Sequence, residues 1–427
     1  MTPRHLLIVS YNHPPFPGPG GNRWLAMSRY LRDAGHTVSI LASDAFGGLP
    51  DDDELGVVRV GDLKSARPLR RLLRRGDLAP LTGSGPEAGL ELPQTALLTK
   101  VLVPDAYVIS WLPALVVAAR RLIGRGEVDC LVTSGPPESV HLAGLLLGRR
   151  RPAWIADFRD GWCFEPLRPA FPTAAQRGLD ARLERRVAST AEIAVGVTRP
   201  IADDLERRLG ARTAYVPNGW DPGAAPGPVS PPAAALRSGV VTLVHTGALS
   251  GDWGRDPEPL LRALRIVRAD PGLPPLRLLH AGRLTTGERE LIDRSGVADA
   301  VECLGMLPRA SALALQRAAD ALVLVTSRNA SEATSKVFEY LAAGRPIVAL
   351  AEDNEAARIV RETKTGLTVA PDDVDAIAEV LRRVASGELA RGYAPSNLER
   401  FSYPGPADAV AELVEIAIER KRSRARR

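Results

Sequence analysis

The sequence predicts an α/β protein with two doubly wound, parallel-sheet domains. Short apolar runs such as HLLIVS (residues 5–10) alternate with helix-like segments, as expected of strands buried on both faces of a parallel sheet. The alternation stops in a stretch rich in Pro, Gly and Ala (residues 222–235) and then starts again. A chain of 427 residues is long enough for such a repeat.

The domain limits follow from this change of composition. We expect a first domain at 1–218, a linker at 219–237, a second domain at 238–398 and a terminal segment at 399–427.

In the first domain, a strand at 5–10 leads through a Pro/Gly loop to a helix over 22–34 and a strand over 37–42, which together form one βαβ unit. Further strands are expected at 56–60, 129–134, 154–157, 192–198 and 213–216, with helices from 138 and over 201–209. Gly18, Gly20 and Gly21 in the first loop imitate a dinucleotide-binding fingerprint only in part, which is a weak signal.

Polar residues follow the middle strands of this domain. Asp157, Arg159 and Asp160 end one strand, and His141 lies on the helix after the strand before it. Because open α/β sheets present the carboxyl ends of their strands to ligands, these residues lie on the edge expected to hold a site. Asp160 is the candidate contact for a ligand hydroxyl, and Arg159 for a phosphate. The alternatives are a buried Asp-Arg-Asp ion network that shapes the edge, and a histidine that is only packed in the core.

The second half repeats the pattern. Strands are expected at 240–245, 276–281, 321–325, 347–350 and 366–369, with helices over 257–269 and 310–319.

Residues 334–348 carry the clearest chemical signal. Thr334 and Ser335 precede a short helix, Gly344 stands where positive φ is needed at its end, and a Pro stops it. A helix start suits a phosphate, and Lys336 adds a positive charge there. Glu339 lies about one turn further on, where a carboxylate can accept hydrogen bonds from a ribose diol. The pattern indicates a nucleotide-diphosphate site, and the alternative is a solvated Lys-Glu pair on a surface helix.

The string SKVFEYLAAGRPIVAL (residues 335–350) resembles the donor site of retaining GT-B glycosyltransferases of the family-4 type. The resemblance implies that Glu339 is the second Glu of an E-x7-E motif and holds the donor ribose. The first Glu position is Ser331, and Glu332 stands one residue late.

Other motifs extend this resemblance along the chain. The pattern P-x-GG-x-x-R … GH-x-V is similar to the first strand and helix of the family. It implies that Gly20 and Gly21 let the backbone approach the donor phosphates, with Arg23 as a phosphate or acceptor partner. Gly247 matches a donor-site glycine and Arg255 lies near the position of a diphosphate-binding Lys, whereas Ala248 replaces the family's Arg.

SGPPESVHLAG … WIADFRDGW resembles a subgroup from bacterial polysaccharide pathways. This adds Asp160 and Arg159 as catalytic candidates, with His141, Asp157 and Arg23 on the acceptor side.

The resemblance implies GT-B architecture, with the two sheets facing across a cleft and a C-terminal helix packed back on the first domain. It also implies transfer of a sugar from a nucleotide-diphosphate donor, most simply a UDP-sugar, to the hydroxyl of a glycan, a lipid-linked precursor or a natural product. Retention and independence from metal ions are further expectations, and no cofactor is expected. The alternatives are a nucleotide-sugar 2-epimerase of the same fold and a catalytically inactive partner subunit.

Composition indicates which classes of binding partner to expect. Apolar residues make up 45% and charged residues 25% of the chain, the balance of a soluble globular protein. The net charge of +5 comes with an excess of Arg and without a nucleic-acid motif, so nucleic acid is not an expected partner. Arg67–Arg75 forms a basic, Leu-containing pattern that indicates either contact with an anionic membrane or a solvated helix face.

Location is inferred from three further observations. The chain starts without a signal-peptide pattern, and its longest apolar stretch (residues 107–119) is too short to span a membrane. Cys130, Cys163 and Cys303 are odd in number and widely spaced, which argues against disulfides and a zinc site. We expect a cytoplasmic protein, and peripheral contact with the inner face of the plasma membrane is a further expectation.

Overall fold

A computed structural model describes residues 2–14, 19–44, 51–62, 100–224, 227, 229–235, 237–251 and 254–426. The predicted basic segment Arg67–Arg75 lies outside these residues. The chain divides into two compact units, one made of Met1–Pro217 with Tyr403–Arg427 and the other of Asn218–Ser402.

The first unit is built on a seven-stranded parallel sheet, as far as the described residues show, with the order β3-β2-β1-β4-β5-β6-β7. Its strands are β1 (His5–Ser10), β2 (Thr37–Ser43), β3 (Val57–Val60), β4 (Cys130–Gly135), β5 (Ala153–Phe158), β6 (Ile193–Gly196) and β7 (Thr213–Tyr215). The central strands are apolar because helices cover both of their faces.

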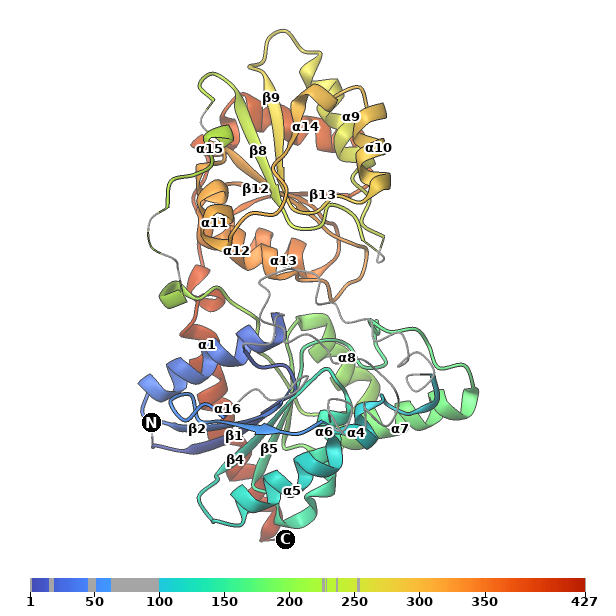
Figure 1. Cartoon of the computed structure of the whole chain (residues 1–427), viewed down its shortest axis with the longest axis vertical. Helices are drawn as coiled ribbons and strands as arrows, with labels where there is room; N and C mark the ends of the chain where they lie inside the picture. Colours follow the sequence, from blue (N-terminus) through green and yellow to red (C-terminus); the bar gives the residue numbers. More distant parts are fainter. Residues whose placement is uncertain are drawn as a thin grey trace, which may run out of the picture. The chain divides into compact units, whose positions relative to one another are not determined.

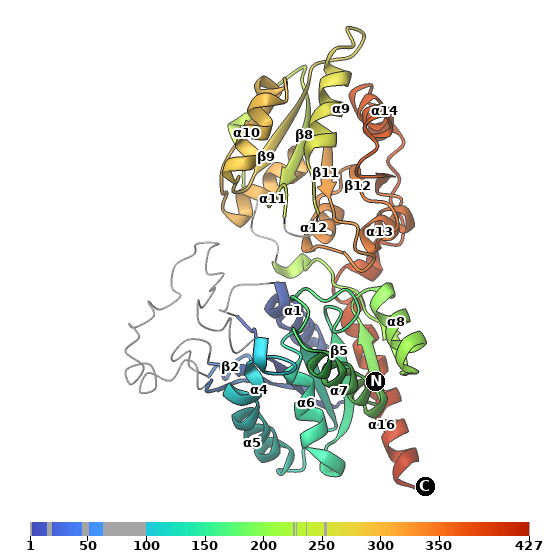
Figure 2. The same cartoon turned by 90° about the vertical axis from the view of Figure 1, so that its right-hand side faces the viewer.

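Helices flank this sheet on both sides (Figure 1). One apolar core lies under α4 (Tyr107–Ser110), α5 (Leu112–Ile123), α6 (Ser139–Leu146), α7 (Ala174–Thr190) and α8 (Arg199–Leu209). The other lies under α1 (Pro19–Asp33) and α16 (Gly405–Ala425). The C-terminal helix α16 therefore belongs to the first unit, and it runs along that unit in both views (Figures 1 and 2).

The strand register sets polar residues side by side at the carboxyl edge. Ser10 pairs with Ser134, and Ser134 pairs with Asp157. The strand order reverses between β1 and β4, and this switch point is where open α/β sheets bind ligands.

The second unit carries a six-stranded parallel sheet within the described residues, in the order β10-β9-β8-β11-β12-β13. Its strands are β8 (Val241–Thr246), β9 (Leu276–Ala281), β10 (Val301–Cys303), β11 (Ala321–Val325), β12 (Ile347–Leu350) and β13 (Gly366–Val369). The helices are α9 (Glu258–Arg268), α10 (Thr286–Arg294), α11 (Arg309–Ala318), α12 (Ser335–Ala343), α13 (Glu355–Thr363), α14 (Val374–Ala385) and α15 (Glu388–Arg391).

The predicted fold class is confirmed: two Rossmann-like α/β units, each with a parallel sheet. One helix start was misplaced. The expected helix over 22–34 begins at Pro19, so Gly20 and Gly21 lie in its first turn rather than in the loop before it. Pro is tolerated there because the first helical residues have no intrahelical acceptor for their N–H groups. None of the described helices is long and apolar enough to cross a bilayer.

Gly144 in α6 sits against the core tryptophan Trp154, and a Cβ at this position would lie 2.3 Å from the Trp154 ring. We predict that Gly144→Ala lowers the free energy of unfolding by about 1–3 kcal/mol, because the ring must shift in a packed core. Urea denaturation measures this change. Gly178→Ala is the matched control, since Gly178 lies exposed in α7 with no neighbour near its Cβ position. That substitution should stabilise by roughly 0.5–1 kcal/mol, and equal effects of the two variants would contradict the packing.

Candidate functional site

The carboxyl edge of the first sheet is fixed by a buried ion pair. Asp157, at the end of β5, is 1% exposed and Arg23 of α1 is 2% exposed. The Asp157 carboxylate accepts hydrogen bonds from Arg23 Nη2 at 3.1 Å, from Trp24 Nε1 at 3.2 Å and from Ser134 Oγ at 2.8 Å. Arg23 also donates to the carbonyl oxygens of Val216 and Pro217, at 3.0 and 2.8 Å.

Arg23 and Asp157 were predicted as acceptor contacts, and the structure pairs them with each other. Both side chains are almost fully buried. A buried charge pair is costly to break because the remaining charge has no solvent. The two residues therefore hold α1 against the ends of β4 and β5.

Arg159 and Asp160 follow directly at the same edge. Arg159 donates to the carbonyl oxygens of Gly135, at 3.0 Å, and of Pro136, and thereby holds the loop after β4. Among the described residues, the Arg159 side chain donates hydrogen bonds to this loop and not to Asp157 or Asp160. Asp160 is half-buried and makes no hydrogen bond or ion pair with any described residue. Burial raises the pKa of its carboxyl, although the nearby Arg159 acts in the opposite direction.

His141 is packed in the core, which is the alternative given for it in the sequence analysis. Its Nδ1 lies 2.9 Å from Thr133 Oγ1, and its ring stacks on Phe158 with 4.6 Å between the centroids. Burial lowers the pKa of His141 to about 3, so the ring is neutral near pH 7. A Cβ on Gly135 would lie 2.6 Å from His141 Nε2, and the glycine therefore admits the ring.

Glu138 is a residue of this edge that the sequence reasoning missed. It stands at the start of α6, between the two prolines of the loop and His141. Burial, with repulsion from Asp105, raises the pKa of Glu138 to about 8, even though Arg168 lies 3.9 Å away. A carboxyl that titrates near neutral pH is a candidate acid or base. The motif SGPPESVHLAG places Glu138 just after a strand. Its burial depends on tertiary packing, so the raised pKa has no signal in the sequence.

In the second unit, two glycines bring three segments together. Gly247 follows β8 with φ +106°, and a Cβ on it would lie 3.1 Å from Lys336 Cε. A Cβ on Gly282 would lie 2.1 Å from the Gly247 carbonyl oxygen, which also lies 2.9 Å from His280 Nε2. The Lys336 side chain thus crosses the Gly247 backbone, and any side chain at 247 would meet it.

Glu339 is held from two sides. Its Oε2 accepts from Lys336 Nζ at 2.9 Å and from Gln316 Nε2 at 3.2 Å. Gln316 is fully buried and also donates to Thr246 Oγ1 at 2.9 Å. The pair is therefore anchored to the end of β8, unlike a solvated pair on a surface helix. Glu339 Oε1 makes no hydrogen bond with any described residue, so it can accept from a ligand.

The start of α12 lies beside this pair. Thr334 occupies the N-cap position, but its side chain does not cap the helix, and its buried Oγ1 has no partner among the described residues. Ser335 is exposed. Val337 N–H in the first turn of α12 donates to the Thr334 carbonyl oxygen at 3.1 Å. The N–H groups of Ser335 and Lys336 are not covered by a capping side chain, which leaves them for water or an anion.

Arg255, predicted as a donor contact, forms an ion pair with Glu332. Its guanidinium donates from Nε at 3.0 Å and from Nη2 at 2.6 Å to Glu332 Oε1. Glu332 Oε2 in turn accepts from the backbone N–H of Ser327 at 2.6 Å. The pair holds residues 327–332 in place, and Glu332 neutralises the charge of Arg255.

Gly20 and Gly21 begin α1. A Cβ on Gly21 would lie 2.9 Å from Pro14 Cδ and 3.1 Å from the Asn12 carbonyl oxygen. The glycine thus permits the loop after β1 to pack against the helix start.

Comparison with known proteins accords with this geometry. Residues 20–219 match the family description "Glycosyl transferase 4-like domain", and residues 241–386 match "Glycosyl transferases group 1". The two matches fall on the two units and together span most of the chain. No match was found among curated proteins.

Solved structures share the fold. The chain is similar to sucrose-phosphate synthase from Thermosynechococcus elongatus, with 18% identity, 96% and 98% of the two chains covered and a TM-score of 0.62. A lipopolysaccharide outer core galactosyltransferase aligns with 13% identity, 96% and 99% coverage and a TM-score of 0.59. A putative UDP-N-acetylglucosamine 2-epimerase from Listeria monocytogenes aligns with 10% identity, 98% and 97% coverage and a TM-score of 0.56.

Two Rossmann-like units with these neighbours define the GT-B architecture. The family matches go further, and the chain belongs to the glycosyltransferases: it is a transferase enzyme.

The buried His141 predicts a pH dependence of stability. Its pKa is about 3 when folded and near 6.5 in the unfolded chain, so the unfolded state binds more protons between these values. The free energy of unfolding should therefore fall as the pH drops from 6.5 towards 4, by about 1.4 kcal/mol per pH unit from this group.

Urea denaturation of the wild type and His141→Asn between pH 7 and 4 measures this contribution. The variant should show the shallower slope by that amount. Glu138, whose raised pKa acts in the opposite direction over part of this range, is present in both proteins and cancels in the difference. Parallel slopes for the two proteins would mean that His141 is accessible to protons.

Proposed function

We propose that this glycosyltransferase binds a nucleotide-diphosphate sugar on its second unit and transfers the sugar with retention to an acceptor hydroxyl. The observation that carries the proposal is the contact of Lys336 with the Gly247 backbone and with Glu339, beside the uncapped start of α12.

The diphosphate would bind where positive groups meet. Lys336 has three donor hydrogens, so it can contact a phosphate while still bonded to Glu339. The first N–H groups of α12 and the exposed Ser335 hydroxyl lie on the same helix end. Such fixed donors stabilise the charge that develops on a departing diphosphate. We propose that they do so without a metal ion or other cofactor.

The ribose would bind to Glu339. Its free Oε1 has two lone pairs for a vicinal diol, and Gln316 fixes the orientation of the carboxylate. Gln316 has no solvent exposure, so it acts by positioning Glu339.

The acceptor side rests on the first unit. We propose that Asp160, the half-buried carboxylate without a described partner, accepts a hydrogen bond from a sugar or acceptor hydroxyl. Arg159 would act by holding the loop at Gly135 and Pro136. Glu138 is a second candidate for proton transfer because its pKa is raised to about 8.

The acceptor class remains a glycan, a lipid-linked precursor or a natural product, with a bacterial polysaccharide pathway as the favoured setting. UDP is the favoured nucleotide, and cytoplasmic location with peripheral membrane contact is part of the same proposal. Neither the epimerase nor the inactive-subunit alternative is favoured by a particular residue.

The donor site predicts selective stabilisation by nucleotides. In a thermal-shift screen with UDP, GDP, ADP and dTDP and their sugars, one nucleotide family should raise Tm. A ligand at 100 times its Kd stabilises by about 2.7 kcal/mol, and each kcal/mol raises Tm by roughly 2–4 °C in domains of this size. Glu339→Ala should remove most of the shift, because a hydrogen bond to a charged group contributes about 1.5–3 kcal/mol.

Glu379→Ala is the matched control. Glu379 pairs with Arg382 at 3.2 Å with i,i+3 spacing, as Glu339 does with Lys336, but both side chains are exposed on α14. This variant should keep the full shift. The donor site would be wrong if no nucleotide shifted Tm, or if both variants lost the shift equally.

The position of Asp160 on the first unit predicts that its substitution lowers sugar transfer without changing nucleotide binding. With the stabilising nucleotide sugar and an acceptor, Asp160→Asn should lower kcat/KM by roughly 10–150-fold, because a hydrogen bond to a charged group contributes about 1.5–3 kcal/mol. Its nucleotide-dependent rise in Tm should stay unchanged, because the donor residues lie in the other unit. NMR of the product should show the anomeric configuration of the donor.

Incubation with the donor alone is the control for the alternative functions. A new epimer formed without an acceptor would support an epimerase, and nucleotide binding without turnover across many acceptors would support an inactive subunit.

A further inference from the structure

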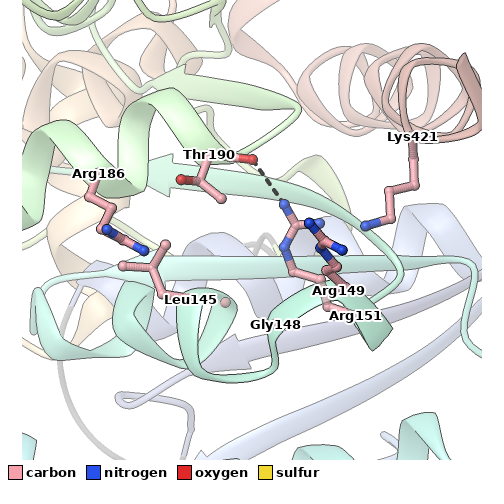
Figure 3. Close-up of a pocket in the computed structure, with 8 residues that line it drawn as sticks. Leu145, Gly148, Arg149, Arg151, Arg186, Thr190 and Lys421 are labelled. Carbon is pink, nitrogen blue, oxygen red and sulfur yellow. Dashed lines mark hydrogen bonds between the residues drawn. The ribbon is translucent and has the colours of Figure 1, made fainter. Parts of the chain in front are cut away.

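A second polar site lies at the opposite edge of the first sheet. A cavity of about 260 Å³ is lined by Gly144, Leu145, Gly148, Arg149, Arg151, Arg186, Thr190 and Lys421. Figure 3 shows Arg149 and Arg151 side by side, with the Lys421 ammonium group pointing towards them, and Arg186 on the other side of Leu145. We call this cavity the basic pocket.

Chain topology places the basic pocket away from the candidate site. Arg151 comes just before β5 begins at Ala153, and Thr190 just before β6 begins at Ile193. In a parallel sheet all strands start at one edge and end at the other. The basic pocket therefore lies at the amino-terminal edge, whereas Asp157 and Asp160 lie at the carboxyl edge.

Four of the residues that line the basic pocket are cationic, and only one of them is neutralised. Arg151 is 6% exposed and donates to Glu192 Oε2 at 3.2 Å and to the Thr190 carbonyl oxygen at 2.9 Å. The side chains of Arg149, Arg186 and Lys421 make no hydrogen bond or ion pair with any residue that the structure describes.

The nearby carboxylate is already fully used. Glu192 is 1% exposed and bonds to Arg151, to Arg424 at 3.1 Å and to the backbone N–H of Trp154 at 2.8 Å. Two arginines thus surround one acid, which leaves the pocket with net positive charge. Burial lowers the pKa of Lys421, and the neighbouring Arg151 acts in the same direction, while Glu192 acts in the opposite direction.

The unpaired cations of the basic pocket repel one another, which raises the free energy of the folded protein. A bound anion would reduce this repulsion. The donors exceed what a carboxylate can accept, since each arginine presents a planar fork of N–H groups and the lysine adds three more. A phosphate group offers three or more acceptor oxygens, and arginine forks match it in geometry. The cavity is several times the volume of a water molecule, about 30 Å³, so a phosphate group fits.

We propose that the basic pocket binds a phosphate group, with Arg149, Arg186 and Lys421 as its direct contacts and Arg151 as the buried support beneath them. The group would be carried by a soluble phosphorylated compound or by the headgroup of an anionic lipid. The proposal does not depend on the nucleotide-sugar site of the second unit.

Calorimetric titration with inorganic phosphate and pyrophosphate at physiological salt tests the proposal. The variant Arg149→Gln/Arg186→Gln should bind at least about tenfold more weakly than the wild type, because it loses two charge-assisted contacts. Both side chains are exposed and unpaired among the described residues, so the fold should persist, and thermal unfolding without ligand checks this.

Two further variants serve as controls. Arg185→Gln removes one arginine charge next to Arg186 on α7, from a side chain that does not line the basic pocket, and this variant should bind like the wild type. Lys336→Gln alters the donor site in the other unit and should leave binding at the basic pocket intact.

Sedimentation with vesicles distinguishes the two sources of phosphate. Wild-type binding to phosphatidic acid vesicles over phosphatidylcholine vesicles, displaced by pyrophosphate and lost in the double variant, would indicate a lipid headgroup. Binding of the soluble ions alone would indicate a soluble compound. The proposal is overturned if neither soluble phosphate nor vesicles bind, or if the double variant binds as tightly as Arg185→Gln.

Discussion

A parallel sheet covered by helices on both faces leaves polar chemistry only at its two edges. The strands β4 and β5 are buried along their whole length, so a charged side chain can reach solvent or a ligand only where a strand begins or ends. The carboxyl edge gathers Asp157 and Asp160, and the amino-terminal edge gathers Arg151 and the basic pocket. Both sheets of this glycosyltransferase obey the same constraint.

A buried charge pair lies at each end of β5. Arg23 with Asp157 lies at one end of the strand, and Arg151 with Glu192 lies at the other. In each pair the arginine also donates to a backbone carbonyl oxygen, and the carboxylate also accepts from a tryptophan ring or backbone N–H group. Buried charges need such hydrogen bonds in order to be tolerated. Their value lies in fixing where the helices and loops sit at each end, more than in net stability.

The fold class could be predicted from the sequence because strands buried on both faces have short, continuous apolar sequences. Gly247, Lys336 and Glu339 were predicted from local motifs, and the structure brings them together although Gly247 is far from α12 in the chain. The partners of buried charges could not be predicted in this way. Arg23 and Asp157 are 134 residues apart, and Gln316 reaches Glu339 from another helix. Only tertiary packing decides such pairs.

The sequence also carries local helix signals at α7 and α5. Thr173 and Gln176 form a capping box at the start of α7, a pattern that marks a helix start in sequence. Pro113 interrupts the apolar stretch at 107–119, yet it stands in the first turn of α5, where proline is compatible with a helix. The raised pKa of Glu138 had no sequence signal, because it arises from burial.

The position of α16 has a consequence for biosynthesis. The chain leaves the first unit at Pro217 and returns only at Tyr403, and the apolar face of α16 covers one side of the first sheet. Domains generally fold from the N-terminus while the ribosome is still working. Here the first unit cannot bury that face until the last helix has emerged, so the part made first must be the later of the two to finish folding.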